Sequence, residues 1–193
     1  MSAIKSVAVF CGSRVGSDPA YAEAMRVLGG GLAKAGIMVV YGGGRIGLMG
    51  ILADATVAAG GQVSGVIPDF LQQLEVAHQG LSELTVTDTM HTRKAKMAEL
   101  ADAFLTMPGG IGTLDETIEI ITWRQLKLHD KPILICDING SARPLLAAIE
   151  ATVAMVFASP SARDLFEPVD GVAAVLVRLT ALPATQGGTS ELV

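Results

Sequence analysis

Short apolar runs alternate with longer helical stretches along most of this sequence. The alternation is typical of βαβ units, in which helices cover both faces of a parallel sheet whose strands are almost continuously apolar. The predicted strands are Val7–Cys11, Met38–Tyr41, Val63–Ile67, Leu84–Thr87, Ala103–Met107 and Ile133–Cys136. The predicted helices are Tyr21–Ala35, Leu48–Ala59, His91–Ala101, Leu114–His129, Leu145–Phe157 and Val172–Leu182. We therefore expect an α/β fold with a parallel sheet and helices on both of its faces.

The composition indicates a folded chain of modest size. With 193 residues, 50% of them hydrophobic and 17% charged, the chain is too apolar to be disordered. A typical domain has about 150 residues, so we expect a single domain over residues 1–182 and a flexible tail over residues 183–193. Little charge is available to cover the surface, which favours an oligomer.

Charge and hydropathy exclude several partners. A net charge of -5 lacks the basic footprint of a general nucleic-acid binder. The longest uncharged stretch, Ala55–Pro68, has fourteen residues, whereas a membrane span needs about 20. Val7–Cys11 is too short for the core of a signal peptide, so we expect a cytoplasmic protein. Cys11 and Cys136 each end an apolar run, which favours buried thiols over a disulfide or a zinc site.

Three glycine-rich turns follow predicted strands. They are Cys11-Gly12-Ser13, Gly42–Gly47 and Pro108–Thr113. In an open parallel sheet, ligands bind at the carboxyl ends of the strands, so all three turns should lie on one edge, where a ligand would bind.

The Gly42–Gly47 turn matches the G-x-G-x-x-G pattern of dinucleotide-binding proteins. A dehydrogenase would bind NAD here, but the acidic residue expected on the ribose about twenty residues later is missing, since Asp69 comes too late. The alternative is that these glycines only permit close packing of helix against strand.

The Pro108–Thr113 turn has the features of an anion site. Its glycines would let backbone N–H groups converge on an anion at the start of a helix, with the Thr113 hydroxyl as a further donor. Asp115 and Glu116 follow where a P-loop has its lysine, which favours a monophosphate over a triphosphate with magnesium. The alternative is a tight turn that Thr113 caps.

The segment His91–Lys96 places Arg93, Lys94 and Lys96 near the start of a predicted helix. Each cation is unfavourable there by roughly 0.3–1 kcal/mol, so we expect a compensating phosphate or a carboxylate such as Glu116 or Glu75. A solvated basic face is the alternative, and Lys96 fits it best.

The three histidines, His78, His91 and His129, do not have the spacing of metal ligands. Lone histidines are most often structural or surface groups. We therefore assign them no chemistry and expect neither a metal nor a cofactor.

Four blocks of sequence together resemble the LONELY GUY (LOG) family. They are Cys11-Gly12-Ser13, Tyr41–Gly50, Met90–Lys94 and Pro108–Glu116, within a resemblance that covers Val7–Phe157. The resemblance implies a Rossmann-like fold and a homodimer without a cofactor, with residues 1–182 as a nucleotide-binding catalytic domain. It also implies hydrolysis of the N-glycosidic bond of a nucleoside 5′-monophosphate, which releases a free base and ribose 5-phosphate. Such sequences often carry the label "possible lysine decarboxylase", but no residue here has the context of a pyridoxal-phosphate lysine.

By this resemblance, Arg93 and Glu116 match the catalytic positions. The residues expected to contact the substrate are Gly12, Ser13, Glu75, Lys94, Gly109, Gly110, Ile111, Gly112, Thr113, Leu114, Asp115 and Thr122. The sequence has Ile111 where many members have an aromatic residue, and Asp115 where many have Glu.

Two questions stay open at this level. A non-catalytic carrier of a phosphorylated ligand, resembling the molybdenum-cofactor carrier proteins, would keep the same glycine turns. The base is also open, because the choice between adenine and an N6-modified adenine depends on the shape of an apolar pocket.

Overall fold

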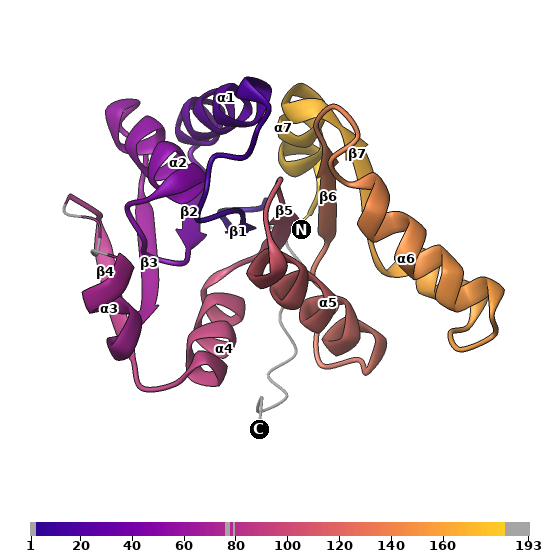
Figure 1. Ribbon diagram of the computed structural model, residues 1–193. Coiled ribbons are helices and arrows are strands. Elements are labelled where there is room, and N and C mark those ends of the chain that lie inside the picture. Colours follow the sequence, from indigo (N-terminus) through magenta and orange to yellow (C-terminus); the bar gives the residue numbers. More distant parts are fainter. Residues whose placement is uncertain (1–2, 76–77, 79, 184–193) are drawn as a thin grey trace.

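The computed structural model describes residues 3–75, 78 and 80–183, with the side chains of residues 73–75 excepted. Its strands form one parallel seven-stranded sheet of order β4-β3-β2-β1-β5-β6-β7 (Figure 1). The strands are β1 (Ser6–Phe10), β2 (Met38–Tyr41), β3 (Val63–Pro68), β4 (Glu83–Thr87), β5 (Ala103–Thr106), β6 (Ile133–Asp137) and β7 (Glu167–Asp170). This architecture confirms the predicted α/β, Rossmann-like fold.

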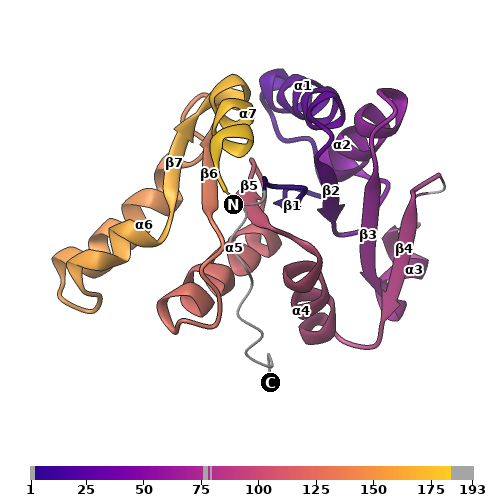
Figure 2. The same cartoon turned by 180° about the vertical axis from the view of Figure 1, so that it is seen from behind.

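Helices pack on both faces of the sheet, as Figures 1 and 2 show from opposite sides. The helices are α1 (Pro19–Ala35), α2 (Gly47–Ala58), α3 (Asp69–Glu75), α4 (Met90–Leu100), α5 (Ile111–Gln125), α6 (Arg143–Ala154) and α7 (Gly171–Ala181), with a 3₁₀ turn at Pro160–Leu165. One apolar core joins the sheet to α1, α2 and α7, and a second joins it to α4, α5 and α6. The central strands are buried from both sides, as their apolar runs predict.

Besides the 3₁₀ turn, one strand and one α-helix have no counterpart among the predicted elements. Strand β7 has the sequence Glu167-Pro168-Val169-Asp170, which lacks an apolar run because it lies at an edge of the sheet, where only Val169 is buried. Helix α3 has only seven residues and follows β3 directly, so its sequence is too short for helical periodicity to show.

Several boundaries also differ from the prediction. Helix α5 ends before Lys127, whose positive φ of 61° cannot continue a helix, whereas we expected it to reach His129. Helix α6 ends at Ala154 because Val156 has a φ of 62°, and Phe157 lies outside the helix. Pro183, expected to begin a flexible tail, forms an antiparallel bridge with Ala3, and residues 184–193 are outside the described part of the chain.

Both cysteines are free, buried thiols, as predicted. Burial raises the pKa of Cys11, and it raises the pKa of Cys136 to about 12, so neither thiol is poised to ionise near neutral pH. Within the described ranges, none of the helices combines the length and the apolar character that crossing a membrane requires.

Candidate active site

The three glycine-rich turns meet at the carboxyl edge of the sheet. The Gly12 N–H donates to the Pro108 carbonyl at 3.1 Å, and the Leu48 N–H donates to the Gly12 carbonyl at 3.0 Å. Gly47 has a φ of 63°, and a Cβ atom there would overlap the backbone of Ser13. The prediction that these turns share one edge is therefore confirmed, and Gly47 serves close packing.

Arg93 and Glu116 form an ion pair at this edge, with 2.8 Å between Nη1 and Oε1. Both residues are only 8% exposed. Arg93 comes from the first turn of α4 and Glu116 from the second turn of α5. Nε of Arg93 also donates to the Val66 carbonyl at the end of β3, at 3.1 Å. The carboxylate expected to compensate the cation of Arg93 is therefore Glu116.

Helix α4 begins with a strong cap despite its cations. The Thr89 hydroxyl accepts from the Thr92 N–H at 3.1 Å, while Thr92 Oγ1 accepts from the Thr89 N–H at 3.1 Å. This reciprocal pair satisfies two of the backbone donors at the start of the helix.

Gly42 makes room for the guanidinium of Arg93. A Cβ atom on Gly42 would overlap Nη2 of Arg93 and come within 3.2 Å of Sδ of Met49. The first glycine of the G-x-G-x-x-G pattern thus faces a protein side chain. Together with Gly47, it supports the alternative that these glycines serve packing.

The surroundings of the ion pair raise the pKa of the Glu116 carboxyl group. Burial raises the pKa of Glu116 above its usual range, and the Arg93 guanidinium opposes this rise without cancelling it. A carboxylate in such surroundings interacts strongly with any positive charge that develops beside it, because little water screens it.

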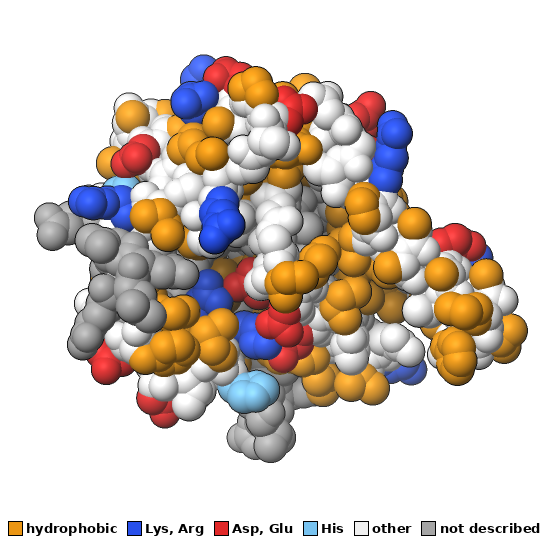
Figure 3. Space-filling model, in the orientation of Figure 1, with side chains coloured by type: hydrophobic (Ala, Val, Ile, Leu, Met, Phe, Trp, Pro, Cys, Tyr) orange, Lys and Arg blue, Asp and Glu red, His pale blue; other side chains and the backbone are white. Residues whose placement is uncertain are grey.

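Lys94 lies between two carboxylates of α5. Its Nζ is 3.1 Å from Oδ2 of Asp115 and 2.8 Å from Oε2 of Glu119, and its side chain is 10% exposed. Burial lowers the pKa of Lys94, but the contacts with Glu119 and Asp115 outweigh this effect and raise it overall. Lys96 lies apart from them and pairs with Glu99 at 3.0 Å. Lys94 therefore joins α4 to α5 beside the Arg93–Glu116 pair. Figure 3 shows basic and acidic side chains lying next to each other on this face of the molecule.

The first turn of α5 begins with Gly110, and no side chain caps it. The proposed cap by Thr113 is wrong, because the helix starts at Ile111 and Thr113 is its third residue. Thr113 is buried, and a Cβ atom on Gly109 would overlap its hydroxyl. The uncapped N–H groups at this positive helix end are suited to an anion.

Two further threonines fix this turn to the sheet. Oγ1 of Thr117 donates to the Thr113 carbonyl at 2.6 Å and lies 2.8 Å from Oγ1 of Thr106 at the end of β5. All three threonines are buried. The start of α5 is therefore held rigidly against the strand that precedes it.

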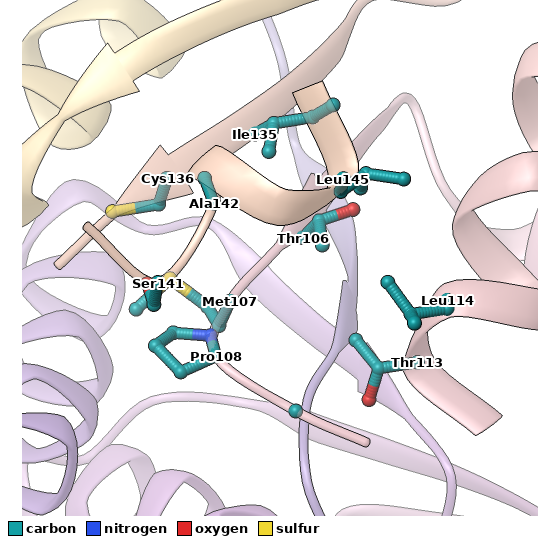
Figure 4. A pocket seen from close by; sticks show the side chains of 11 residues that line it. Thr106, Met107, Pro108, Thr113, Leu114, Ile135, Cys136, Ser141, Ala142 and Leu145 are labelled. Carbon is teal, nitrogen blue, oxygen red and sulfur yellow. The ribbon is translucent and has the colours of Figure 1, made fainter. Parts of the chain in front are cut away.

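A small pocket opens beside the Pro108–Thr113 turn (Figure 4). It lies between the ends of β5 and β6 and the starts of α5 and α6. Its lining residues are Thr106, Met107, Pro108, Gly109, Thr113, Leu114, Ile135, Cys136, Ser141, Ala142 and Leu145. The lining is mostly apolar, with hydroxyl groups from Thr106, Thr113 and Ser141.

The other predicted substrate residues are spread more widely. Gly12 is buried within the edge, and Glu75 is the last residue of α3. The exposed ones are Ser13, Gly109, Gly110, Ile111, Gly112, Leu114, Asp115 and Thr122. Ile111 is 82% exposed, and Oγ1 of Thr122 donates to the Ile118 carbonyl at 2.8 Å.

Sequence reasoning missed two partners of the cations. The Val66 carbonyl is a backbone group and leaves no residue signature, whereas Glu119 could have been found because it lies on the same helical face as Asp115, four residues later. Within the described residues, no three potential metal-ligating side chains are grouped.

Comparisons with known proteins identify the family. A family model described as "Possible lysine decarboxylase" matches residues 49–179. A cytokinin riboside 5′-monophosphate phosphoribohydrolase of Rhodococcoides fascians is 46% identical over 161 residues, which are 83% of this chain and 81% of that protein. The chain belongs to the LOG family. LOG1 of Arabidopsis thaliana, another cytokinin riboside 5′-monophosphate phosphoribohydrolase, is 43% identical over 85% of this chain and 77% of its own length.

Solved structures with the same fold are more distant from this LOG family member. The molybdenum cofactor binding protein of Rippkaea orientalis has a TM-score of 0.70 and 16% identity, over 94% of this chain and 97% of that chain. The molybdenum cofactor carrier protein of Chlamydomonas reinhardtii has a TM-score of 0.69 and 17% identity, over 94% of this chain and 100% of that chain. These two likenesses show the fold alone.

Proposed function

We propose that this chain hydrolyses the N-glycosidic bond of adenosine 5′-monophosphate or an N6-modified relative, releasing the base and ribose 5-phosphate. The buried Arg93–Glu116 pair, beside an uncapped helix start suited to phosphate, is the observation that carries the proposal. Relatives that are 43–46% identical over most of the chain bear the name of this activity.

Glu116 is the group that stabilises the positive charge formed on the sugar. Cleavage of the bond between C1′ and the base nitrogen leaves positive charge on the ribose, as in glycoside hydrolysis. The carboxylate, buried and close to the incoming ribose, would stabilise that charge and accept a proton from the attacking water. The water oxygen then forms the new bond to C1′.

Arg93 serves the opposite side of the reaction. Its guanidinium stays protonated, so it stabilises negative charge on the phosphate or on the departing base and does not donate a proton. The base takes its proton through water. The Val66 carbonyl and Glu116 hold the guanidinium in one orientation, which lowers the cost of ordering it when substrate binds.

The Gly109–Thr113 turn holds the 5′-phosphate at the start of α5. At about 1.5 Å per residue, Glu116 lies about 7 Å along the helix from Ile111, a distance on the scale of one ribose between its phosphate and C1′. Binding energy from the phosphate can therefore orient the sugar at Glu116.

The exposed face of α5 is the surface on which we propose that a homodimer forms. Ile111, Leu114 and Ile118 are 82%, 38% and 42% exposed and recur at helical spacing, and Figure 3 shows hydrophobic side chains over the outer side of α5. Thr122 follows Ile118 by one turn on the same face. It is about 120° around the helix from Glu116, so the proposed dimer face and the catalytic carboxylate lie on different sides of α5.

The carrier alternative draws support only from the fold, because the likeness to carrier proteins is below 20% identity. A carrier has no need of a buried ion pair beside the anion site, whereas hydrolysis uses both of its charges. A cytoplasmic location stays a prediction.

The direct experiment is to incubate the purified protein with adenosine 5′-monophosphate and measure both products. The proposal predicts that adenine and ribose 5-phosphate appear in equal amounts. Release of inorganic phosphate with no free base would overturn it, since a different bond would then be cleaved.

A further inference from the structure

Glu119 on α5 binds a cation of α4 next to the Arg93–Glu116 pair. Its Oε2 lies 2.8 Å from Nζ of Lys94. Oε2 is buried and makes no hydrogen bond of ordinary geometry within the described part of the chain, so the ammonium of Lys94 compensates its charge. A buried charge that loses its partner is strongly unfavourable. Glu119 and Lys94 therefore depend on each other.

The sequence places two ion pairs between α4 and α5 side by side. Arg93 and Lys94 are consecutive residues of α4, whereas Glu116 and Glu119 lie about one helical turn apart on α5. Successive residues of a helix point about 100° apart, so the two cations leave α4 in different directions. The helix is thus attached to α5 at two points, which restricts both sliding and rotation more than a single pair would.

We infer that Glu119 is a positioning residue, which holds α4 against α5 through Lys94 and so keeps Arg93 in register with Glu116. The inference rests on the proposed function, because this is the pair that we propose acts on the nucleoside monophosphate. Among the side-chain hydrogen bonds and ion pairs of the described residues, none joins Glu119 to Arg93 or Glu116. Its influence on them passes through Lys94.

Asp115, the second carboxylate on Lys94, holds it less firmly. Its Oδ2 is 3.1 Å from Nζ and its side chain is 57% exposed, whereas the side chain of Glu119 is 20% exposed. Water screens an exposed pair, so the contact with Asp115 contributes less. Burial lowers the pKa of Lys94, and the contact with Glu119 opposes this effect more than the contact with Asp115 does. Glu119 is therefore the carboxylate to test.

The test compares Glu119→Gln with Glu99→Gln. Glu119→Gln keeps the shape of the side chain but removes its charge, so Lys94 loses the more buried of its partners. The kcat for adenosine 5′-monophosphate should fall about tenfold and the KM should change less, because Glu116 acts on charge that forms during the reaction. Glu99→Gln is the matched control, since it breaks an exposed pair with Lys96 inside α4 and should leave kcat unchanged.

Two further variants separate positioning from a general loss of stability. Glu119→Asp keeps the charge, and the flexible lysine side chain can follow it, so this variant should keep most of the kcat. In protein that already carries Lys94→Met, Glu119→Gln should have no further effect on kcat, because Glu119 acts through Lys94. A second tenfold loss in that background would overturn the inference, and so would an unchanged kcat in Glu119→Gln alone.

The exchange of one guanidinium proton tests the inference without a substrate. The Nε–H of Arg93 is buried and donates to the Val66 carbonyl at 3.1 Å, so it should exchange slowly and give a separate NMR signal. In Glu119→Gln and in Lys94→Met it should exchange at least about tenfold faster, but in Glu99→Gln at the rate of the unchanged protein. Testing two variants keeps the result independent of whether either one folds. Unchanged exchange together with a lower melting temperature would assign the Lys94–Glu119 pair to stability alone and overturn the inference.

Base release tests the proposed function, whereas proton exchange tests the role of Glu119. Unchanged protein that releases no base from adenosine 5′-monophosphate would overturn the proposed function, and exchange at Arg93 would still decide whether Glu119 holds the pair. Base release by the unchanged protein, with unchanged exchange and kcat in Glu119→Gln, would overturn only the inference about Glu119.

Discussion

Arg93 and Glu116 come from two helices, α4 and α5, that cover the same face of the sheet, and they meet in a buried ion pair of 2.8 Å. A backbone carbonyl of β3 holds the arginine, and a glycine of the β2–α2 turn leaves space for it. The amino-terminal turns of α4 and α5, a carbonyl of β3 and the turn after β2 therefore together fix one pair of charges. Such a buried pair contributes little net stability, which is consistent with retention for chemistry.

Replacing Glu116 should abolish turnover and spare binding. Glu116→Gln keeps the shape and an oxygen for Arg93 but loses the negative charge, so kcat should fall by at least about 100-fold while nucleotide still binds. Arg93→Ala should impair turnover and nucleotide binding, because the guanidinium contributes to each of them. Turnover and calorimetric titration measure the two effects.

Thermal unfolding is the control for both substitutions. Breaking a buried pair costs about 3–5 kcal/mol, so cooperative melting must be verified before activity is compared. Full activity in Glu116→Gln would contradict the catalytic role proposed for the Glu116 carboxylate.

The fall of kcat/KM at acid pH should follow the protonation of Glu116. The proposed reaction requires the ionised carboxylate, and burial raises its pKa, so activity is present above this pKa and is lost as the pH falls through it. The midpoint should lie above the usual glutamate value of about 4.3. A rate profile over acid to neutral pH measures it, and a midpoint at or below that value would contradict the buried role.

Gly42→Ala should displace the guanidinium of Arg93, although Gly42 itself takes no part in the reaction. Its Cβ would overlap the guanidinium, so we expect a loss of kcat/KM of at least about tenfold. Gly30→Ala is the matched control, because nothing lies within 4 Å of a Cβ there and the residue is inside α1. It should keep full activity and gain about 0.5–1 kcal/mol of stability. Equal activity in both variants would refute this role of Gly42.

Ile118→Glu should yield a monomer. A charge in the middle of the exposed α5 face is costly to bury against a second copy. Light scattering at micromolar concentration should show a dimer for the unchanged protein and a monomer for this variant. Val177→Glu, on the exposed side of α7, should stay dimeric. A monomeric unchanged protein would refute the proposed dimer.

Most of the fold could be predicted from the sequence, because strands buried on both faces leave continuous apolar runs. Val7–Phe10 and Ala103–Leu105 show this in the centre of the sheet. Strand β7 could not be predicted, because an edge strand with Pro168 and two acidic residues has no such run.

The candidate site could be predicted in its parts but not in its contacts. Three cations near the start of a helix indicated that partners were needed, and Glu116 was one of the expected carboxylates. The role of Gly42 depends on contact with the side chain of Arg93, which lies far away in the sequence, and no local pattern encodes such a contact.

The most direct measurement compares base release from adenosine and isopentenyladenosine 5′-monophosphates with release from the same nucleosides without phosphate. The account predicts free base from the monophosphates and almost none from the nucleosides, because the phosphate at the start of α5 orients the sugar at Glu116. Equal rates from nucleosides and monophosphates would contradict the phosphate-binding turn, and no base from any of the four would contradict the hydrolase.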